Sequence, residues 1–351
     1  MSILTGDASR QNIAGVQYVK RSVGSIRDVA RETGLSITTV SRVMNSAENV
    51  SAKTRAIVLE ACDRLDYLPN PAARALSTSK SKTVAAIIPT IEHSVFAKFI
   101  AAIERALGQR GYSLVLAVSN GDADEELQAA RKLLGMGAQA FILSGALHRP
   151  GLLEMFERRQ VPFVFTSVWD AAGDQPTIGY DNAGLAKSAV DYLAAQGHRD
   201  IGVIHGPLAE NDRTLARRQG AENAQSARLG LHFFETPLSV HGGKLALRRA
   251  LETPAPITAL LCFSDVLALG VYFGLAEAGK EVPGDMSVMG FDNLDWARDA
   301  APPLTTIDLP AADMGAAVAG QIMQCLETSA PLGSHLLGGT IIERASVRRI
   351  D

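Results

Sequence analysis

One short segment carries side chains that could hydrogen-bond to nucleobases and phosphates. Residues 36–45 read SITTVSRVMN. If the segment is helical, its outward side carries Ile37, Thr38, Ser41, Arg42 and Asn45. An arginine can pair bidentately with guanine, and an isoleucine or threonine methyl can contact the methyl group of thymine. The segment therefore has the chemistry needed to distinguish one base pair from another.

Two amphipathic helices are predicted to position this surface, because one apolar spacing occurs on both sides of a glycine. The spacing i, i+3, i+4 is formed by Ile26, Val29 and Ala30, and again by Val40, Val43 and Met44. Between them, Gly34 suits the left-handed residue that ends a helix, and Ser36 can cap the next one. This order indicates a helix-turn-helix, which lays its second helix in the DNA major groove. An ordinary helical hairpin is the alternative.

A third helix and a short linker are predicted to follow. Ser51 can cap a helix over 52–66, whose apolar face carries Ile57, Val58, Ala61 and Leu65. The next stretch, NPAARALSTS at 70–79, has too few apolar groups for a helix that persists alone in water. Residues 1–24 show no apolar periodicity and are predicted to form a flexible arm.

In these residues the chain resembles the lactose-repressor family of bacterial transcription factors. The matching stretches are IRDVARETGLSITTVSRVMN, VSAKTR and LDYLPNPAARALST, in that order. The resemblance implies that 70–82 is a hinge helix, which orders on operator DNA, pairs with its dimer mate and wedges Leu76 into the minor groove. A plain interdomain linker is the alternative. The expected DNA contacts are Ser36, Ile37, Thr38, Thr39, Ser41, Arg42, Asn45, Ser51, Asn70, Ala73 and Leu76.

From residue 83 onward, short apolar runs alternate with helical patterns. Strands are predicted at 84–89, 113–119, 140–145, 162–167, 200–206, 259–264 and 287–292, with helices between them that include 96–111 and 124–134. Such alternation predicts a parallel sheet covered by helices on both faces, and the chain is long enough for two. The resemblance implies an α/β core of two doubly wound parallel-sheet subdomains, similar to periplasmic binding proteins.

The predicted organisation has four parts. Residues 1–24 form the arm, 25–69 the all-α helix-turn-helix headpiece, 70–82 the hinge, and 83–351 the effector-binding and dimerisation core. By the resemblance, the N-subdomain comprises about 83–179 and 308–338, and the C-subdomain about 180–307 and 339–351.

Residues that end the predicted core strands form a candidate ligand site. Arg217 follows a polar loop, 208–214, after the predicted strand that ends at Gly206, and its guanidinium can fork onto hydroxyls or a carboxylate. Arg217 and Asp292 match effector-binding residues of the family, whereas Ser264 stands where the family usually has asparagine. The candidate set is Phe96, Ser167, Trp169, Arg217, Ser264, Asp265, Phe291 and Asp292. It suits a polyhydroxylated effector, a sugar or sugar acid; a nucleobase is the alternative.

Length and charge agree with this division. The 351 residues exceed one typical domain and carry a net charge of −3. Residues 1–82 hold twelve Lys and Arg against seven Asp and Glu, whereas the remainder holds twenty-two against thirty. A basic N-terminal part beside an acidic body favours a DNA-binding headpiece on a core that does not bind DNA. No apolar run reaches the roughly 18 residues of a membrane span, and the N-terminus lacks a secretory pattern.

Several other functions lack their motif. The three cysteines are far apart and the seven histidines are scattered, so we expect reduced thiols, no metal and no cofactor. The stretch GMGAQA at 135–140 precedes a strand, the wrong order for dinucleotide binding, and no catalytic constellation is found. The sequence therefore predicts a cytoplasmic, nucleoid-associated regulator, a repressor that acts as a homodimer on a palindromic operator and is not an enzyme. The alternative is a sugar-sensing module that no longer binds DNA.

Overall fold

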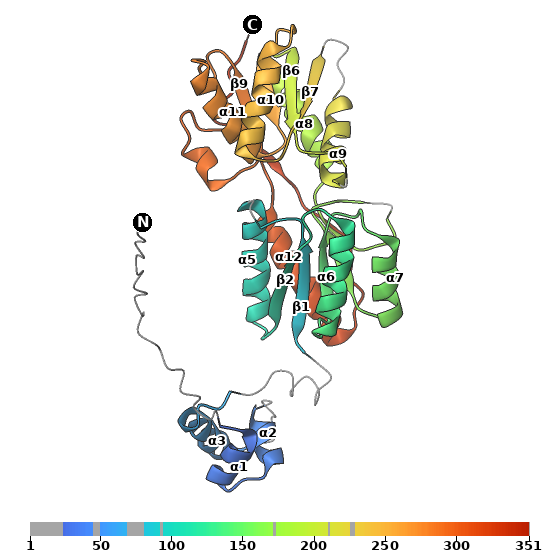
Figure 1. Ribbon diagram of the computed structural model, residues 1–351, viewed down its shortest axis with the longest axis vertical. Helices are drawn as coiled ribbons and strands as arrows, with labels where there is room; N and C mark the ends of the chain where they lie inside the picture. Colours follow the sequence, from blue (N-terminus) through green and yellow to red (C-terminus); the bar gives the residue numbers. More distant parts are fainter. Residues whose placement is uncertain are drawn as a thin grey trace, which may run out of the picture. The chain divides into compact units, whose positions relative to one another are not determined.

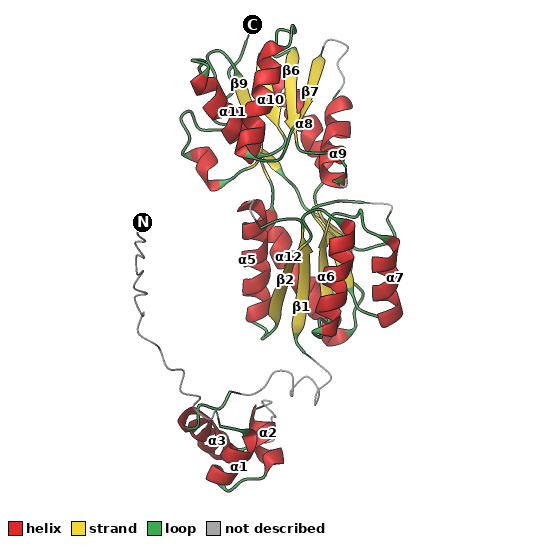
Figure 2. Cartoon of the chain, viewed as in Figure 1, coloured by secondary structure: helices red, strands yellow, loops and turns green. Residues whose placement is uncertain are grey.

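The computed structural model describes residues 24–44, 50–68, 81–91, 94–170, 173–209, 211–224 and 229–350 (Figure 1). The chain divides into two compact units, Met1–Ser81 and Lys82–Asp351. The first unit is helical in its described part, and the second combines helices with strands (Figure 2). No helix among the described residues is both long and apolar enough to cross a membrane.

Three short helices form the headpiece: α1 (Ile26–Thr33), α2 (Ile37–Met44) and α3 (Ala52–Arg64). A capping box at Ser25 begins α1, and Gly34 ends it with a φ of 68°. The Ser36 hydroxyl accepts a hydrogen bond from the Thr39 amide at 3.1 Å, and Ser51 caps α3 through Thr54. The predicted cap residues and helix starts are therefore confirmed.

The headpiece core is formed by the predicted apolar faces except at Ile57, which is 41% exposed and is not among the core residues, so its predicted place on the buried face is wrong. The buried members of the core are Val29, Ala30, Val40, Val43, Val58, Ala61 and Cys62. The third helix ends at Arg64, two residues earlier than predicted. Asp66 takes a left-handed conformation with a φ of 49°, and the Tyr67 amide turns back to donate to the Cys62 carbonyl at 2.9 Å. The turn, rather than another helical residue, satisfies that carbonyl.

The first sheet of the larger unit has the strand order β11-β5-β4-β3-β1-β2. Its strands are β1 (Thr83–Ile88), β2 (Ser113–Val118), β3 (Ala140–Ser144), β4 (Phe163–Thr166), β5 (Thr177–Gly179) and β11 (His335–Leu336), all paired in parallel. Side chains alternate along β1, so Val84 and Ala86 pack toward α5 (Ser94–Gly108) and α12 (Ala311–Thr328). Ala85 and Ile87 pack on the other face, toward α6 (Ala123–Gly135) and α7 (Pro150–Arg159).

The second sheet has the order β12-β10-β9-β8-β6-β7. Its strands are β6 (Asp200–His205), β7 (Gly230–Glu235), β8 (Ala259–Cys262), β9 (Ser287–Asp292), β10 (Thr305–Asp308) and β12 (Thr340–Ile342), of which only the described pairing of β12 with β10 is antiparallel. Helices α8 (Asn182–Ala195) and α9 (Asp212–Glu222) cover one face, and α10 (Val240–Glu252) and α11 (Asp265–Glu277) cover the other. A 3₁₀ turn, η1 (Asp295–Arg298), follows β9. Two helix-covered parallel sheets confirm the predicted fold class.

The chain passes between the two sheets three times, after β5, after β10 and after β11. Every predicted core strand is present, but β5, β7, β10 and β11 were not predicted, and β12 overlaps a strand-like stretch, 341–347, at only two residues. Four of these have four residues or fewer, and such short segments become strands through pairing with neighbours rather than through their own pattern. Helix α5 ends at Gly108, earlier than predicted, because Gly111 turns the chain with a φ of 70°.

We expect Gly220→Ala to destabilise the larger unit by about 1–3 kcal/mol, because helices α8 and α9 touch at this glycine. A Cβ at Gly220 would overlap the backbone carbonyl of Ala183. Denaturant unfolding of the full chain measures the loss. Gly320→Ala in α12 is the matched control, because a Cβ there meets no atom within 4 Å and helix propensity favours alanine. Equal stability of the two variants would contradict close packing at Gly220.

Candidate functional site

Helix α2 presents the predicted base-reading side chains to solvent. Ile37 is 46% exposed, and Thr38 and Arg42 are also exposed. Val40 and Val43 on the opposite face are buried against α1 and α3. An exposed isoleucine costs hydrophobic free energy in water, which a partner with an apolar group such as a thymine methyl would recover. The local packing therefore leaves the predicted reading surface uncovered within the headpiece.

The predicted phosphate contacts lie around this surface or outside the described residues. Ser36 and Ser51 are exposed at the starts of their helices, while Thr39 and Ser41 are half-buried. Each capping hydroxyl accepts from a backbone amide and shares a hydrogen bond with the hydroxyl of Thr39 or Thr54, so one O–H of each Ser–Thr pair remains to donate to a phosphate oxygen. The predicted contacts Asn45, Asn70, Ala73 and Leu76 lie outside the described residues.

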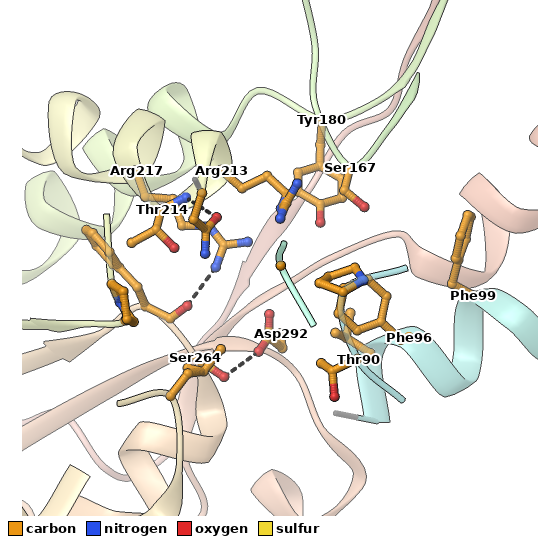
Figure 3. Close-up of a pocket in the computed structure, with 18 of the residues that line it drawn as sticks. Thr90, Phe96, Phe99, Ser167, Tyr180, Arg213, Thr214, Arg217, Ser264 and Asp292 are labelled. Carbon is orange, nitrogen blue, oxygen red and sulfur yellow. Dashed lines mark hydrogen bonds between the residues drawn. The ribbon is translucent and has the colours of Figure 1, made fainter. Parts of the chain in front are cut away.

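A cavity of about 380 Å³ lies at the carboxyl ends of the strands of both sheets in the larger unit. Phe96, Phe99 and Thr90 line it from the first sheet's subdomain (Figure 3). From the other subdomain come Arg213, Thr214 and Arg217 of α9, together with Ser264 and Asp292. Aromatic faces combined with a few convergent polar groups are typical of sites for small polar molecules with apolar faces.

Arg217 is fixed in one orientation by its neighbours. Its Nε donates to Asn182 Oδ1 at 2.9 Å, and its Nη1 donates to the Phe263 carbonyl at 2.6 Å. Its guanidinium also stacks on the Phe291 ring, 3.9 Å from the centroid. Burial lowers the pKa of Arg217, and the nearby Asp292 carboxylate opposes this effect. A guanidinium held in this way still has N–H groups that can donate to a ligand. Because the side chain is already ordered, binding costs it little conformational entropy.

Asp292 forms the acidic side of the cavity. The Ser264 hydroxyl donates to Asp292 Oδ2 at 2.8 Å and also caps α11 (Figure 3). Burial raises the pKa of Asp292 to about 7, while the charge of Arg217 acts in the opposite direction. The backbone at Asp292 has a φ of 123°, a conformation that costs a non-glycine residue about 1–3 kcal/mol. Strain and a raised pKa together indicate a position that serves function rather than stability.

Five of the eight predicted effector contacts line the cavity: Phe96, Ser167, Arg217, Ser264 and Asp292. Trp169, Asp265 and Phe291 are not among the lining residues. Asp265 and Phe291 are also fully buried, so their predicted direct contact is wrong, whereas that of Trp169 stays a prediction. Asp265 is fully buried, and its carboxylate accepts hydrogen bonds from the Thr306 hydroxyl and the Leu294 amide. Phe291 lies behind Arg217 as its stacking partner. These two residues therefore support the wall instead of forming it.

Several polar residues at the site were missed from sequence. Tyr180, Arg213 and Thr214 line the cavity, and Asn182 connects Arg217 to the Ser167 carbonyl through its amide at 2.8 Å. Arg213 and Thr214 lie one helical turn before Arg217, so helix periodicity could have placed them on the same face. Asn182 and Tyr180 follow the unpredicted strand β5, and that strand carried no recognisable signal.

We expect the stability of the larger unit to fall with rising pH through ionisation of Asp292. The pKa of Asp292 is higher in the folded state than in the unfolded state. Its contribution to the free energy of unfolding is therefore fully present below about pH 4 and is lost as the pH rises through about 7. Asp292→Asn removes this dependence. In denaturant unfolding, the free energy of unfolding of the variant minus that of the wild type should increase by at least about 1 kcal/mol when the pH is raised from about 5 to about 8. A difference between the two proteins that does not vary with pH would contradict the assignment.

Comparison with family models finds two matches in this chain. Residues 25–70 match the model described as bacterial regulatory proteins, lacI family. Residues 190–347 match the model of a periplasmic binding protein-like domain. The first match spans the described headpiece helices, and the second spans α9, Ser264 and Asp292.

Individual proteins and structures are similar over most of the chain. The catabolite control protein A of Priestia megaterium is 32% identical over 297 residues, which cover 83% of this chain and 89% of that protein. The crystal structure of the lac repressor dimer bound to operator and the anti-inducer ONPF has a TM-score of 0.81 and 27% identity, covering 93% of this chain and 99% of that chain. The structure of a LacI family transcriptional regulator from Enterococcus faecalis V583, with bound ribose, has a TM-score of 0.69 and 27% identity. The match covers 77% of this chain and 100% of that chain.

Proposed function

The chain belongs to the lacI family of bacterial regulatory proteins, and on that premise we propose that it is a transcriptional repressor whose operator affinity is controlled by a small molecule. The observation that carries the proposal is the exposed face of α2, where Ile37, Thr38 and Arg42 are directed away from a fully formed core. This face combines an apolar side chain, a hydroxyl and a guanidinium, which are the groups that contact base edges in the major groove. We place its action in the cytoplasm, where chromosomal DNA is accessible.

A twofold arrangement follows from the size of one reading surface. One headpiece contacts too few base pairs for a unique site, so two copies on a palindromic operator are required. We propose a homodimer, as in the lac repressor structure, and a hinge at 70–82 in which Leu76 enters the minor groove. These hinge residues lie almost entirely outside the described part of the chain, so the proposal rests on the family resemblance.

The effector is proposed to be a sugar or sugar acid bound in the cavity between the two subdomains. Arg217 and Asp292 supply a strong donor and a strong acceptor, and Phe96 supplies an apolar face on which a sugar ring can pack. The related Enterococcus faecalis regulator holds ribose, which supports this class. The relatives are regulators, and we assign this chain no enzymatic reaction.

Effector control requires that the ligand bind two arrangements of the subdomains with different affinities. The hydrogen bonds from Arg217 through Asn182 to the Ser167 carbonyl already join the two walls of the cavity. A ligand that contacts both walls would favour one relative position of the subdomains. Because the hinge enters the larger unit at β1, that position would set how two headpieces are presented to DNA.

Fluorescence anisotropy with a labelled duplex from the protein's own promoter region tests this function. The full chain should bind that duplex at least about a thousandfold more tightly than a scrambled duplex of equal length, at one stated salt concentration. Addition of a sugar that raises the unfolding temperature of the protein should then change the affinity for the promoter duplex. Equal affinity for both duplexes would contradict specific DNA binding and favour a sugar-sensing module. If no stabilising ligand changes the affinity for the promoter duplex, the proposed effector control is wrong.

A further inference from the structure

A second cavity of about 360 Å³ adjoins the first. It lies at the carboxyl ends of β1, β2 and β3, where Ile87, Ser119 and Ser144 contribute to its wall. The two cavities share three wall residues: Pro89, Gly121 and Arg213. Arg213 therefore stands where one cavity meets the other.

The wall at this junction is built from both subdomains. Arg213 Nη1 donates to Asp212 Oδ1 at 3.0 Å, and Asp212 Oδ2 accepts a hydrogen bond from the Ala146 amide at 2.6 Å. The two side chains are only 16% and 24% exposed. Helix α9 of one subdomain thus reaches the loop after β3 of the other, so the second cavity, like the first, lies between the subdomains.

A buried polar pair lines the second cavity. His148 Nδ1 lies 2.8 Å from Glu126 Oε2 and its Nε2 lies 3.1 Å from the Gly145 carbonyl oxygen, with the two side chains 1% and 9% exposed. Beside them, the Ser144 hydroxyl is buried and has no hydrogen-bond partner among the described residues. A buried hydroxyl without a partner is costly, and a ligand hydroxyl would satisfy it once a small movement of the wall opened the Ser144 side chain to the cavity.

The charges around the second cavity favour a neutral ligand. Carboxylates of Asp122, Glu126 and Asp212 line it, opposed by the guanidinium groups of Arg149 and Arg213. Arg149 is already paired with Asp124 at 2.8 Å. A phosphate or carboxylate would meet three like charges, whereas hydroxyl groups can donate to carboxylates and accept from guanidinium groups. The chemistry is that of a polyhydroxylated, uncharged group.

We propose that the two cavities form one binding site with two compartments and that the effector is a neutral disaccharide or glycoside. One ring lies beside Arg217 and Asp292, and the second lies beside Ser144 and the His148–Glu126 pair. Arg213 contacts the link between the rings. This inference rests on the proposed function, since it names the effector class of that same site.

Isothermal titration calorimetry on the full chain tests the two compartments without involving DNA. The probes are glucose and galactose, their disaccharides cellobiose, maltose, lactose and melibiose, and glucose 6-phosphate as the charged alternative. The expected result is that one disaccharide binds at least about tenfold more tightly than either of its constituent sugars, because the second compartment offers the second ring the polar side chains of Asp122, Arg149 and Asp212.

Two variants fill the second compartment while leaving Arg217 and Asp292 in place. Ser144→Leu places a larger side chain inside the compartment. Leu147→Trp enlarges a lining side chain that is 60% exposed, so the larger ring should not disturb the core. Both should remove the advantage of the disaccharide and keep the monosaccharide dissociation constant within about twofold. Met136→Trp, at an equally exposed residue that lines neither cavity, is the matched control and should change neither value.

Each other outcome overturns the assignment. A monosaccharide that binds as tightly as every disaccharide, tightest binding of glucose 6-phosphate, or no binding by any probe would refute a neutral two-ring effector. Equal weakening of both ligand classes by Leu147→Trp would refute separate compartments. The proposed function fails differently, through equal affinity for the promoter and scrambled duplexes, which calorimetry with sugars does not measure.

Discussion

Arg217→Met is expected to weaken effector binding by about 2–5 kcal/mol, which is roughly thirtyfold or more. Arg217 is 8% exposed and its guanidinium is held by Asn182, the Phe263 carbonyl and the Phe291 ring, so it meets a ligand already oriented. Methionine keeps much of the volume but has no donor. The loss also leaves Asp292 without its nearby positive charge. Calorimetry with the tightest-binding sugar measures the change.

The matched control is Arg218→Met, one residue along the same helix. Arg218 pairs with Glu222 at 2.9 Å and stacks on Phe233, and it does not line the cavity. Both variants should bind the promoter duplex as the wild type does, which shows that they are folded. Only the Arg217 variant should lose the response of DNA affinity to the sugar. A dissociation constant within about threefold of the wild type would remove Arg217 from the ligand contacts.

Arg42→Ala is expected to weaken operator binding by about 1–3 kcal/mol and to relax the preference at one base position in each half-site. Arg42 lies near the end of α2 on the exposed face that also carries Ile37 and Thr38. A bidentate arginine distinguishes guanine from the other bases, so its loss changes sequence preference and not merely affinity. Binding measured on a set of duplexes with single substitutions separates the two effects.

Arg31→Ala controls for charge alone. Arg31 lies on α1, its side chain is 78% exposed, and it pairs only weakly with Asp28 at 3.0 Å, as surface ion pairs do. Its removal should lower affinity for every duplex by the same factor, or not at all, and should leave the base preference unchanged. If Arg42→Ala behaves in the same way, Arg42 contacts phosphate and another residue reads the base.

The sequence by itself determined the features that depend on local chemistry. Gly34 ends α1 because only a residue without a Cβ adopts its backbone conformation cheaply, and Ser36 and Ser51 begin helices because their hydroxyls satisfy the nearest amides. The spacing of Val40 and Val43 decided which face of α2 is buried, and therefore which face remains exposed. Apolar runs likewise predicted seven of the twelve strands described in the core, but they missed β7, which is as long as the longest of those seven.

Only the tertiary structure decided which side chains of the core meet. Asp265 begins a helix and Asp292 ends a strand. Asp265 is buried and accepts hydrogen bonds from Thr306 and Leu294, whereas Asp292 lines the cavity. Arg213 joins the two cavities because α9 and the loop after β3 approach across two subdomains. Such contacts join residues 29 to 66 positions apart in the chain, where no local preference acts, so they arise only when the sheets are assembled.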